Sequence, residues 1–179
     1  MIPALEGERV RLRPFRAADR DALFAIYSDP VAMRYWGFEP WTELAQAEAH
    51  IAPLLEVGEA PATYPWAIAR RGDDVLVGTT TLFALRRDQL RCELGYALAP
   101  AEHGKGLASE AVRLALAYGF GELALERVEA DVDPRNAASC RLLERLGFQR
   151  EGLLRARWRV AGEVTDSVIF GLLRGELIL

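Results

Sequence analysis

A glycine-rich turn in the middle of the chain limits the folds that this sequence can adopt. Residues 90–98 before it alternate as a strand does, and residues 107–123 after it repeat apolar side chains at the spacing of a buried helix. Gly104 and Gly106 lie between them, on either side of Lys105, the only lysine among 22 basic residues. Glycines let a backbone approach a ligand, and the first turn of a helix offers unpaired N–H groups to an anion. The segment predicts a phosphate-binding turn, with an ordinary strand-to-helix turn as the alternative.

The hydrophobic pattern around this turn predicts an α+β fold with a mixed sheet. Alternation with a period of two indicates strands, and a repeat near 3.6 residues indicates helices. Gly72 and the two aspartates after it favour a tight turn, so the strands on either side should form a hairpin. The second helix should begin with Thr42 as its N-cap. The expected strands are 8–15, 66–70, 75–85, 90–98, 126–133, 155–160 and 164–172, and the expected helices are 18–28, 42–55, 107–123 and 136–146.

Length and composition narrow the class of protein. The chain of 179 residues has the size of one domain, which we expect to span residues 1–179. A net charge of −4 argues against a nucleic-acid or membrane-surface partner. The longest uncharged run, residues 75–85, is shorter than the roughly 20 residues that cross a bilayer. Only Cys92 and Cys140 are present, which excludes a disulfide framework. Because no signal peptide is visible, the sequence predicts a soluble cytoplasmic protein.

Three kinds of phosphate-binding turn can be compared at this position. A Walker loop needs Ser or Thr after its lysine, whereas Gly106 follows Lys105. A dinucleotide fingerprint would use Ser109 as its third small residue and Glu126 or Glu129 as its acid, which the sequence permits. The predicted order of strands and helices does not suit a dinucleotide-binding fold, because the turn follows an antiparallel hairpin and no second mononucleotide-binding half comes after it.

The third kind of turn is carried by residues 103–108, which resemble the Gln/Arg-x-x-Gly-x-Gly/Ala motif of the GCN5-related N-acetyltransferases (GNAT). The resemblance runs almost from end to end. It implies a splayed, mostly antiparallel sheet of six to seven strands flanked by helices, and a transferase that uses acetyl-CoA and no metal. The segments that match, in the order of the RimJ/RimL-like branch of ribosomal-protein N-terminal acetyltransferases, are residues 8–14, 29–35, 93–96, 109–111, Asn136, Ser139, Leu142, 147–148, Trp158 and Asp166.

The resemblance also implies which residues hold acetyl-CoA. They are Leu98, His103, Gly104, Lys105, Gly106, Leu107, Ala108, Ser109, Asn136 and Ser139. Two positions depart from the family pattern. His103 stands where Gln or Arg is usual, and Leu143 stands where many members have a tyrosine that protonates the departing thiolate. That role is left to Ser139 or to water. The two histidines, His50 and His103, are far apart in the sequence, so we expect no metal site.

Glu93 is the candidate catalytic base. Strand alternation places it on one face with Gly95, Ala97 and Ala99, whose small side chains leave room for a ligand. A carboxylate there can take the proton of an attacking amine, directly or through a water. The alternative is an ion pair with one of the many arginines. A main-chain N–H in residues 93–95 would polarise the thioester carbonyl if Gly95 forms a bulge.

The sequence indicates the residues that bind the acceptor less specifically than those that bind acetyl-CoA. Tyr35, Trp36 and Trp158 are the candidate substrate-binding residues, and the alternative is that such rings form the core of a lid. The predicted reaction transfers acetyl to a primary amine, above all a protein or peptide N-terminus. A small amine (a polyamine, an amino acid or an antibiotic) is the alternative acceptor, and a non-catalytic acyl-CoA-binding module is the alternative function. Both a monomer and a homodimer are compatible with the sequence.

Overall fold

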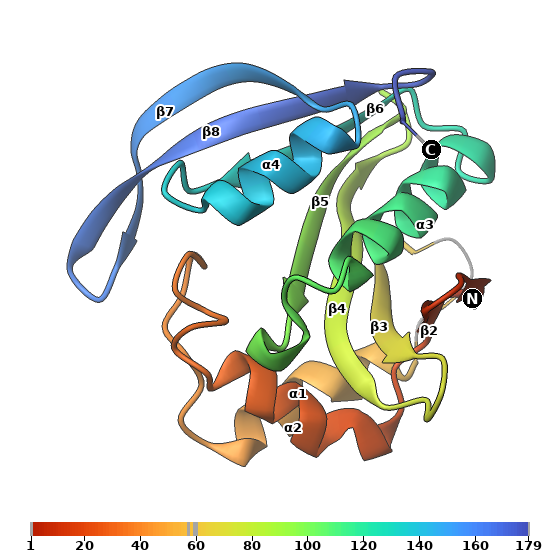
Figure 1. Cartoon of the computed structure of the whole chain (residues 1–179), viewed down its shortest axis with the longest axis vertical. Helices are drawn as coiled ribbons and strands as arrows, with labels where there is room; N and C mark the ends of the chain where they lie inside the picture. Colours follow the sequence, from red (N-terminus) through yellow and green to blue (C-terminus); the bar gives the residue numbers. More distant parts are fainter. Residues whose placement is uncertain (1, 57, 59–60, 179) are drawn as a thin grey trace.

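Eight strands form one mixed sheet in the computed structural model, which describes residues 2–56, 58 and 61–178 (Figure 1). They are β1 (Leu5–Glu6), β2 (Val10–Arg13), β3 (Tyr64–Arg70), β4 (Leu76–Arg86), β5 (Arg91–Leu98), β6 (Arg127–Val132), β7 (Gln149–Val160) and β8 (Glu163–Leu173). Their order across the sheet is β1-β2-β3-β4-β5-β6-β8-β7. Neighbouring strands are antiparallel except β5 and β6, which are parallel.

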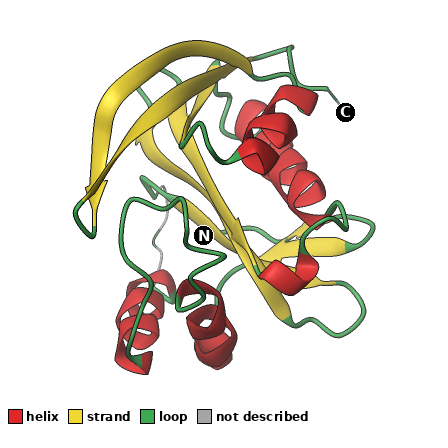
Figure 2. Ribbon diagram, turned by 60° about the vertical axis from the view of Figure 1, so that its left-hand side comes forward, coloured by secondary structure: helices red, strands yellow, loops and turns green. Residues whose placement is uncertain are grey.

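Two pairs of helices cover opposite faces of this sheet (Figure 2). They are α1 (Arg20–Tyr27), α2 (Leu44–Ile51), α3 (Leu107–Gly121) and α4 (Ala137–Arg145). Even-numbered side chains of β5, such as Cys92 and Leu94, pack with α3 and α4 in the larger core. Ala97 of β5 packs with α1 and α2 in a smaller core on the other face. This arrangement confirms the α+β class, and by alternation it places Glu93 and Gly95 on the face of α1 and α2.

The sheet splits between β5 and β6. These strands pair over three positions, from Arg91 opposite Arg127 to Glu93 opposite Glu129. Beyond them β5 stays with β4, and β6 stays with β8. Parallel neighbours need a crossover connection, which α3 provides. The split leaves one edge of β5 without a neighbouring strand, so its backbone groups can pair with a ligand.

The sheet has eight strands rather than the six to seven expected, and β1 is the added one, because it is too short to produce a periodic pattern. β7 begins at Gln149 rather than at Arg155. Every position of this strand except Val160 is exposed, so it pairs with β8 without an alternating buried face that would mark where it begins. Thr42 as an N-cap is wrong. Glu43 is the N-cap of α2, and the side chain of Gln46 accepts hydrogen bonds from the N–H groups of Thr42 and Glu43. The other expected elements are present, with ends shifted by a few residues.

β7 and β8 form a long hairpin that arches past α4 (Figure 1). Trp158 of this hairpin lies against Gly37 in the loop after α1, where an added Cβ would come within 3.1 Å of the indole ring. Trp158 Nε1 also donates a hydrogen bond of 3.4 Å to Asp131 of β6. The loop after α1 is therefore in contact with the half of the split sheet that β6, β8 and β7 form. No helix in the described part of the chain is long and apolar enough to cross a membrane.

Candidate active site

A cavity of about 590 Å³ lies between β5, the start of α3 and α4, and we call it the β5–α4 cavity. This volume lies in the range of roughly 300–1,000 Å³ that is typical of small-molecule sites. Tyr96 and Ala97 of β5 and Arg141 and Arg145 of α4 also contribute to its wall. All the expected cofactor residues except Lys105 line it: Leu98, His103, Gly104, Gly106, Leu107, Ala108, Ser109, Asn136 and Ser139.

The glycine turn has a backbone that only glycine adopts easily. Gly104 and Gly106 have φ angles of +75° and +76°, in the left-handed region. Gly106 is the N-cap of α3, and no side chain from the described residues caps the helix there. The first N–H groups of α3 are therefore available to an anion, with the positive end of the helix dipole behind them. This cradle fits the pyrophosphate of a CoA thioester.

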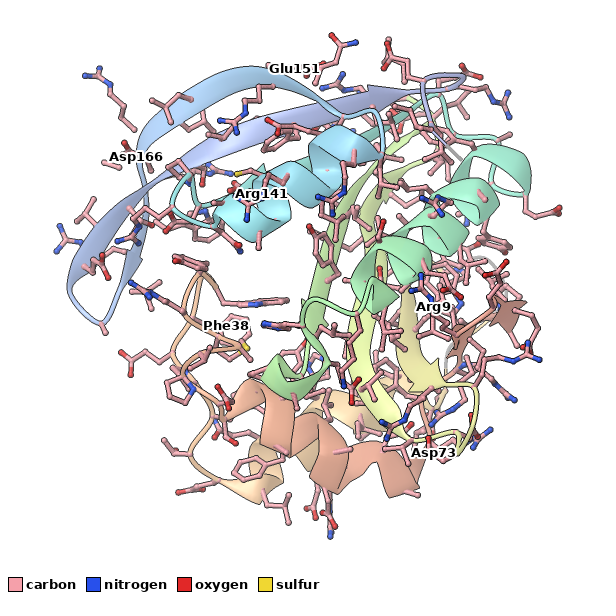
Figure 3. All side chains as sticks on the ribbon, viewed as in Figure 1. Arg9, Phe38, Asp73, Arg141, Glu151 and Asp166 are labelled. Carbon is pink, nitrogen blue, oxygen red and sulfur yellow. The ribbon has the colours of Figure 1, made fainter. Side chains whose placement is uncertain are left out.

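Arg9, in the turn before β2, holds this loop against the start of α3 (Figure 3). Its Nη1 donates to the carbonyl oxygen of Lys105 at 2.9 Å, and its Nε donates to Glu110 Oε2 at 2.9 Å. Glu110 Oε1 also accepts hydrogen bonds from the backbone N–H groups of Arg9 and Val10. These bonds fix the loop and engage the Lys105 carbonyl, an oxygen that would otherwise repel an anion.

Lys105→Ala should change the affinity for acetyl-CoA only modestly. Lys105 Nζ pairs with Glu102 Oε2 at 3.0 Å, and 54% of the side chain is exposed. An ammonium group that is engaged by a carboxylate and largely exposed to water adds about 1 kcal/mol or less to the binding of a phosphate, so we expect the KM for acetyl-CoA to rise by about fivefold or less. Steady-state thiol release measures this KM. An increase well beyond that range would show that the ammonium group itself holds a phosphate.

Asn136 begins α4 and sets the position of Ser139. Its Oδ1 accepts a hydrogen bond of 3.1 Å from Ser139 N–H, as an N-cap does. Ser139 Oγ lies 2.6 Å from the Oη of Tyr96, which reaches across from β5. Burial raises the pKa of Tyr96 to about 12, so the phenol stays protonated at neutral pH and can donate a hydrogen bond. In the sequence, Tyr96 ends the matching segment 93–96, but alternation groups it with core side chains such as Leu94, so the sequence does not predict its contact with Ser139.

The free edge of β5 presents backbone groups to the β5–α4 cavity. Ala99 N–H donates a hydrogen bond of 2.8 Å to the carbonyl oxygen of Val77 in β4, so by alternation the odd-numbered positions of β5 turn their N–H and C=O groups toward β4 and the even-numbered ones turn theirs away from it. In agreement with this, the carbonyl oxygen of Leu98 lies 3.0 Å from His103 Nε2. Leu94 and Tyr96 present their N–H and C=O groups where β6 no longer pairs. An extended ligand with amide groups can bind such an edge as an added strand does.

Glu93 lies at the point where β5 and β6 separate. It is the last paired position, and no arginine nitrogen of the described residues comes within 4.0 Å of its carboxylate. Burial raises the pKa of Glu93, and the charges of Glu129 and Asp131 raise it further, against the opposing charges of Arg91 and Arg157. A carboxylate with a raised pKa is a stronger base, so this environment suits proton transfer from an amine.

The expected bulge at Gly95 is wrong. The β4–β5 register is continuous through Gly95 as far as Phe83 opposite Glu93, and the irregularity follows only between Phe83 and Arg86. The break in pairing is instead on the other edge of β5, where β6 departs. An unpaired main-chain N–H within residues 93–95 is therefore that of Leu94, and the departure of a neighbouring strand exposes it.

A second cavity, of about 230 Å³, lies on the face of α1 and α2, and we call it the α1-side cavity. Trp36 lines both cavities, whereas Tyr35 lines only the β5–α4 cavity. Trp158 lines neither of them and is 41% exposed in the hairpin. The lining of the α1-side cavity consists of Phe15, Tyr27, Trp36, Phe38, His50, Leu54, Thr63, Pro65, Thr79, Thr81, Phe83 and Gly95.

Comparison with known proteins identifies the family. The model of the acetyltransferase (GNAT) domain matches residues 9–149. The chain belongs to the GNAT acetyltransferase family. It is 36% identical over 175 residues to the uncharacterized N-acetyltransferase p20 of Bacillus licheniformis, with 98% of each chain covered. It is 26% identical to spermidine N(1)-acetyltransferase of Escherichia coli (strain K12), over 89% of this chain and 83% of that protein. The crystal structure of a GNAT-family acetyltransferase from Bacillus anthracis matches with a TM-score of 0.85 at 26% identity, covering 97% of this chain and 100% of that one.

In this GNAT acetyltransferase, two arginines of α4 add positive charge to the β5–α4 cavity. Arg141 and Arg145 line it one helical turn apart, and no carboxylate of the described residues pairs with either (Figure 3 labels Arg141). Guanidinium groups bind phosphate oxygens well, so this pair suits the phosphates of CoA. Their spacing is visible in the sequence, but the face of α4 that meets the cavity is set by packing of Leu142 and Leu143 in the core. No cluster of three metal-ligating side chains occurs in the described part of the chain.

Proposed function

We propose that this enzyme transfers the acetyl group of acetyl-CoA to the N-terminal amine of a protein or peptide, with Glu93 as the base and one domain over residues 1–179 as the catalytic unit. The observation that supports it most is a carboxylate of raised pKa, without an arginine partner among the described residues, where β5 leaves β6. The RimJ/RimL-like pattern of residues 8–14 and 93–96 supports the protein acceptor.

Three parts of the site hold acetyl-CoA in this proposal. The pyrophosphate binds the N–H groups that follow Gly106, and a phosphate pairs with Arg141 or Arg145. The amides of the pantetheine arm pair with the free edge of β5 at Leu94 and Tyr96. Since this edge ends at the last β5–β6 pair, the arrangement brings the thioester close to the base.

In the reaction, the amine attacks the thioester carbonyl, so a C–N bond forms and the C–S bond breaks. Amines are mostly protonated at neutral pH, and the attacking nitrogen must lose a proton. Glu93 takes this proton, and its raised pKa makes it a stronger base than an exposed glutamate. The N–H of Leu94 polarises the carbonyl oxygen as negative charge develops on it.

Ser139 and Tyr96 stabilise the departing thiolate. Their oxygens are 2.6 Å apart, and the phenol donates to Ser139 while the Ser139 hydroxyl donates toward the sulfur. Either Ser139 or a water delivers the final proton. This pair takes the role that many relatives give to a tyrosine at the position of Leu143.

The state of the cysteines supports direct transfer from thioester to amine. Cys92 and Cys140 are both buried, and burial raises the pKa of Cys92 to about 12. A thiol acts as a nucleophile in its thiolate form, which burial disfavours. Neither side chain is therefore suited to carry the acetyl group between donor and acceptor.

A polyamine is the second candidate acceptor, because the chain resembles a spermidine acetyltransferase and carries acidic residues on β6. Glu129 and Asp131 are those residues, and they would attract a cation. Arg91 and Arg127 pair with Glu129 at 3.4 and 2.8 Å, and Arg157 lies 3.5 Å from Asp131. These arginines offset the negative charge, which favours an acceptor with a single amine.

An acetylation screen tests the proposal. Peptides with different first residues, spermidine and other small amines are incubated with acetyl-CoA, and thiol release and intact mass are measured. We expect an added acetyl group on peptide N-termini. A preference for spermidine would select the polyamine acceptor. Binding of acetyl-CoA in calorimetry without turnover on any amine would identify a non-catalytic acyl-CoA-binding module.

A further inference from the structure

We infer that the α1-side cavity binds an apolar group next to the reacting amine. The preferred acceptor is then an amine with a bulky apolar substituent, such as a peptide that begins with leucine or phenylalanine. This inference rests on the proposed function and goes beyond it, because it names the class of acceptor.

The wall of the α1-side cavity is chemically suited to an apolar group. Among the described residues that line it, none is acidic. The hydroxyl of Thr79 is already engaged, 3.1 Å from Tyr27 Oη. Apolar surface gains free energy on leaving water for such a site, whereas a charged tail would lose its hydration without a counter-charge. The large apolar and aromatic side chains in the wall are Phe15, Tyr27, Trp36, Phe38, Leu54 and Phe83.

The size of the cavity suits one side chain. An engineered apolar cavity of roughly 150 Å³ binds benzene. The α1-side cavity, of about 230 Å³, is larger than that. A leucine or phenylalanine side chain therefore fits, while the rest of a peptide stays outside.

The position of the cavity links it to the reacting amine. Gly95, which lines it, follows Glu93 by two residues and so lies on the same strand face. Phe83, another lining residue, is the β4 partner of Glu93. Trp36 lines this cavity and the β5–α4 cavity, and Phe38 contributes to its wall from the loop after α1 (Figure 3 labels Phe38). An amine at Glu93 would have its substituent beside the α1-side cavity.

A series of amino-acid amides tests this inference. Glycinamide, alaninamide, leucinamide and phenylalaninamide differ only in the side chain, and kcat/KM for each, and for spermidine, is measured by thiol release. We expect kcat/KM to rise by about tenfold or more from glycinamide to leucinamide or phenylalaninamide, since each methylene in an apolar pocket contributes to selectivity. Equal values across the amides, or a higher value for spermidine, would overturn the inference and leave amine acetylation in place. Normal acetyl-CoA binding without turnover on any amine would instead overturn the proposed function.

Two variants connect the selectivity to the cavity. Thr81 lines it opposite Gly95, so Thr81→Phe should fill the space and bring kcat/KM for leucinamide to within about threefold of that for glycinamide. Thr81→Val keeps the volume and should keep the preference. Phe38 is 40% exposed, so Phe38→Ala should fold, open the wall and reduce the preference. Acetyl-CoA affinity in calorimetry reports folding. Wild-type selectivity in both Thr81→Phe and Phe38→Ala would overturn the inference.

Discussion

Glu93→Gln should lower turnover by about 100-fold or more at neutral pH and leave the affinity for acetyl-CoA nearly unchanged. Glutamine keeps the shape of the side chain but cannot accept the proton of the amine. The affinity should be retained because Glu93 is not among the residues that line the β5–α4 cavity. Thiol release measures turnover, calorimetry measures binding, and a thermal melt shows that the variant is folded.

The pH profile distinguishes a base from a structural carboxylate. Glu93 accepts a proton only when it is ionised. Burial raises its pKa above the ordinary 4.5, and the negative charges of Glu129 and Asp131 raise it further. Activity should therefore rise with pH over a higher range than for an exposed glutamate. Asp131→Asn removes a negative charge, lowers the pKa of Glu93 and should move this rise to lower pH. In Glu93→Gln this rise should be lost, and turnover should recover partly at high pH, where more of the amine is neutral. Near-normal turnover of Glu93→Gln across neutral pH would rule out the base.

Gly106→Val should abolish detectable binding of acetyl-CoA while the protein remains folded. The φ angle of +76° at Gly106 is strained for any other residue, above all for a β-branched one. An added Cβ would also come within 3.0 Å of Arg9 Nη1, the group that holds the loop. The loop must then rearrange, and the N–H groups at the start of α3 lose their alignment on the pyrophosphate. Calorimetry measures the binding, and far-ultraviolet circular dichroism with a thermal melt checks the fold.

Gly72→Val is the matched control for this prediction. Gly72 lies in the turn between β3 and β4, an added Cβ there meets nothing within 4 Å, and its φ is outside the left-handed region. This variant should bind acetyl-CoA as the wild type does. Normal affinity in Gly106→Val would show that the glycine turn is not the pyrophosphate site.

The elements that could be predicted from the sequence are those with a regular hydrophobic repeat. In β6 every second residue is buried, and α3 is buried over most of its surface, so the pattern alone places both. The two residues of β1 are too few for a repeat, and β7 is exposed at every position except Val160, so no alternating buried face marks its first half. Both pair with strands whose positions depend on the whole sheet, and no local pattern contains that information.

The features of the candidate site also divide into those that could be predicted from the sequence and those that depend on tertiary structure. The left-handed glycines and the N-cap at Asn136 follow from residue types with strong backbone preferences, so the turn could be predicted. The contact between Tyr96 and Ser139 joins residues 43 positions apart and depends on how α4 packs across the split sheet. The lack of an arginine partner for Glu93 also depends on tertiary structure, because the composition alone favours an ion pair.

The single lysine makes chemical labelling selective in this protein. Lys105 Nζ is the only side-chain amine of the chain, is largely exposed and is held beside the glycine turn by Glu102. An amine-reactive fluorophore would attach to side chains at this position alone. Because the attachment point is within the loop that Arg9 anchors, the emission of the dye should respond when a nucleotide occupies the neighbouring cavity. Ligand binding could then be followed optically without introducing a cysteine.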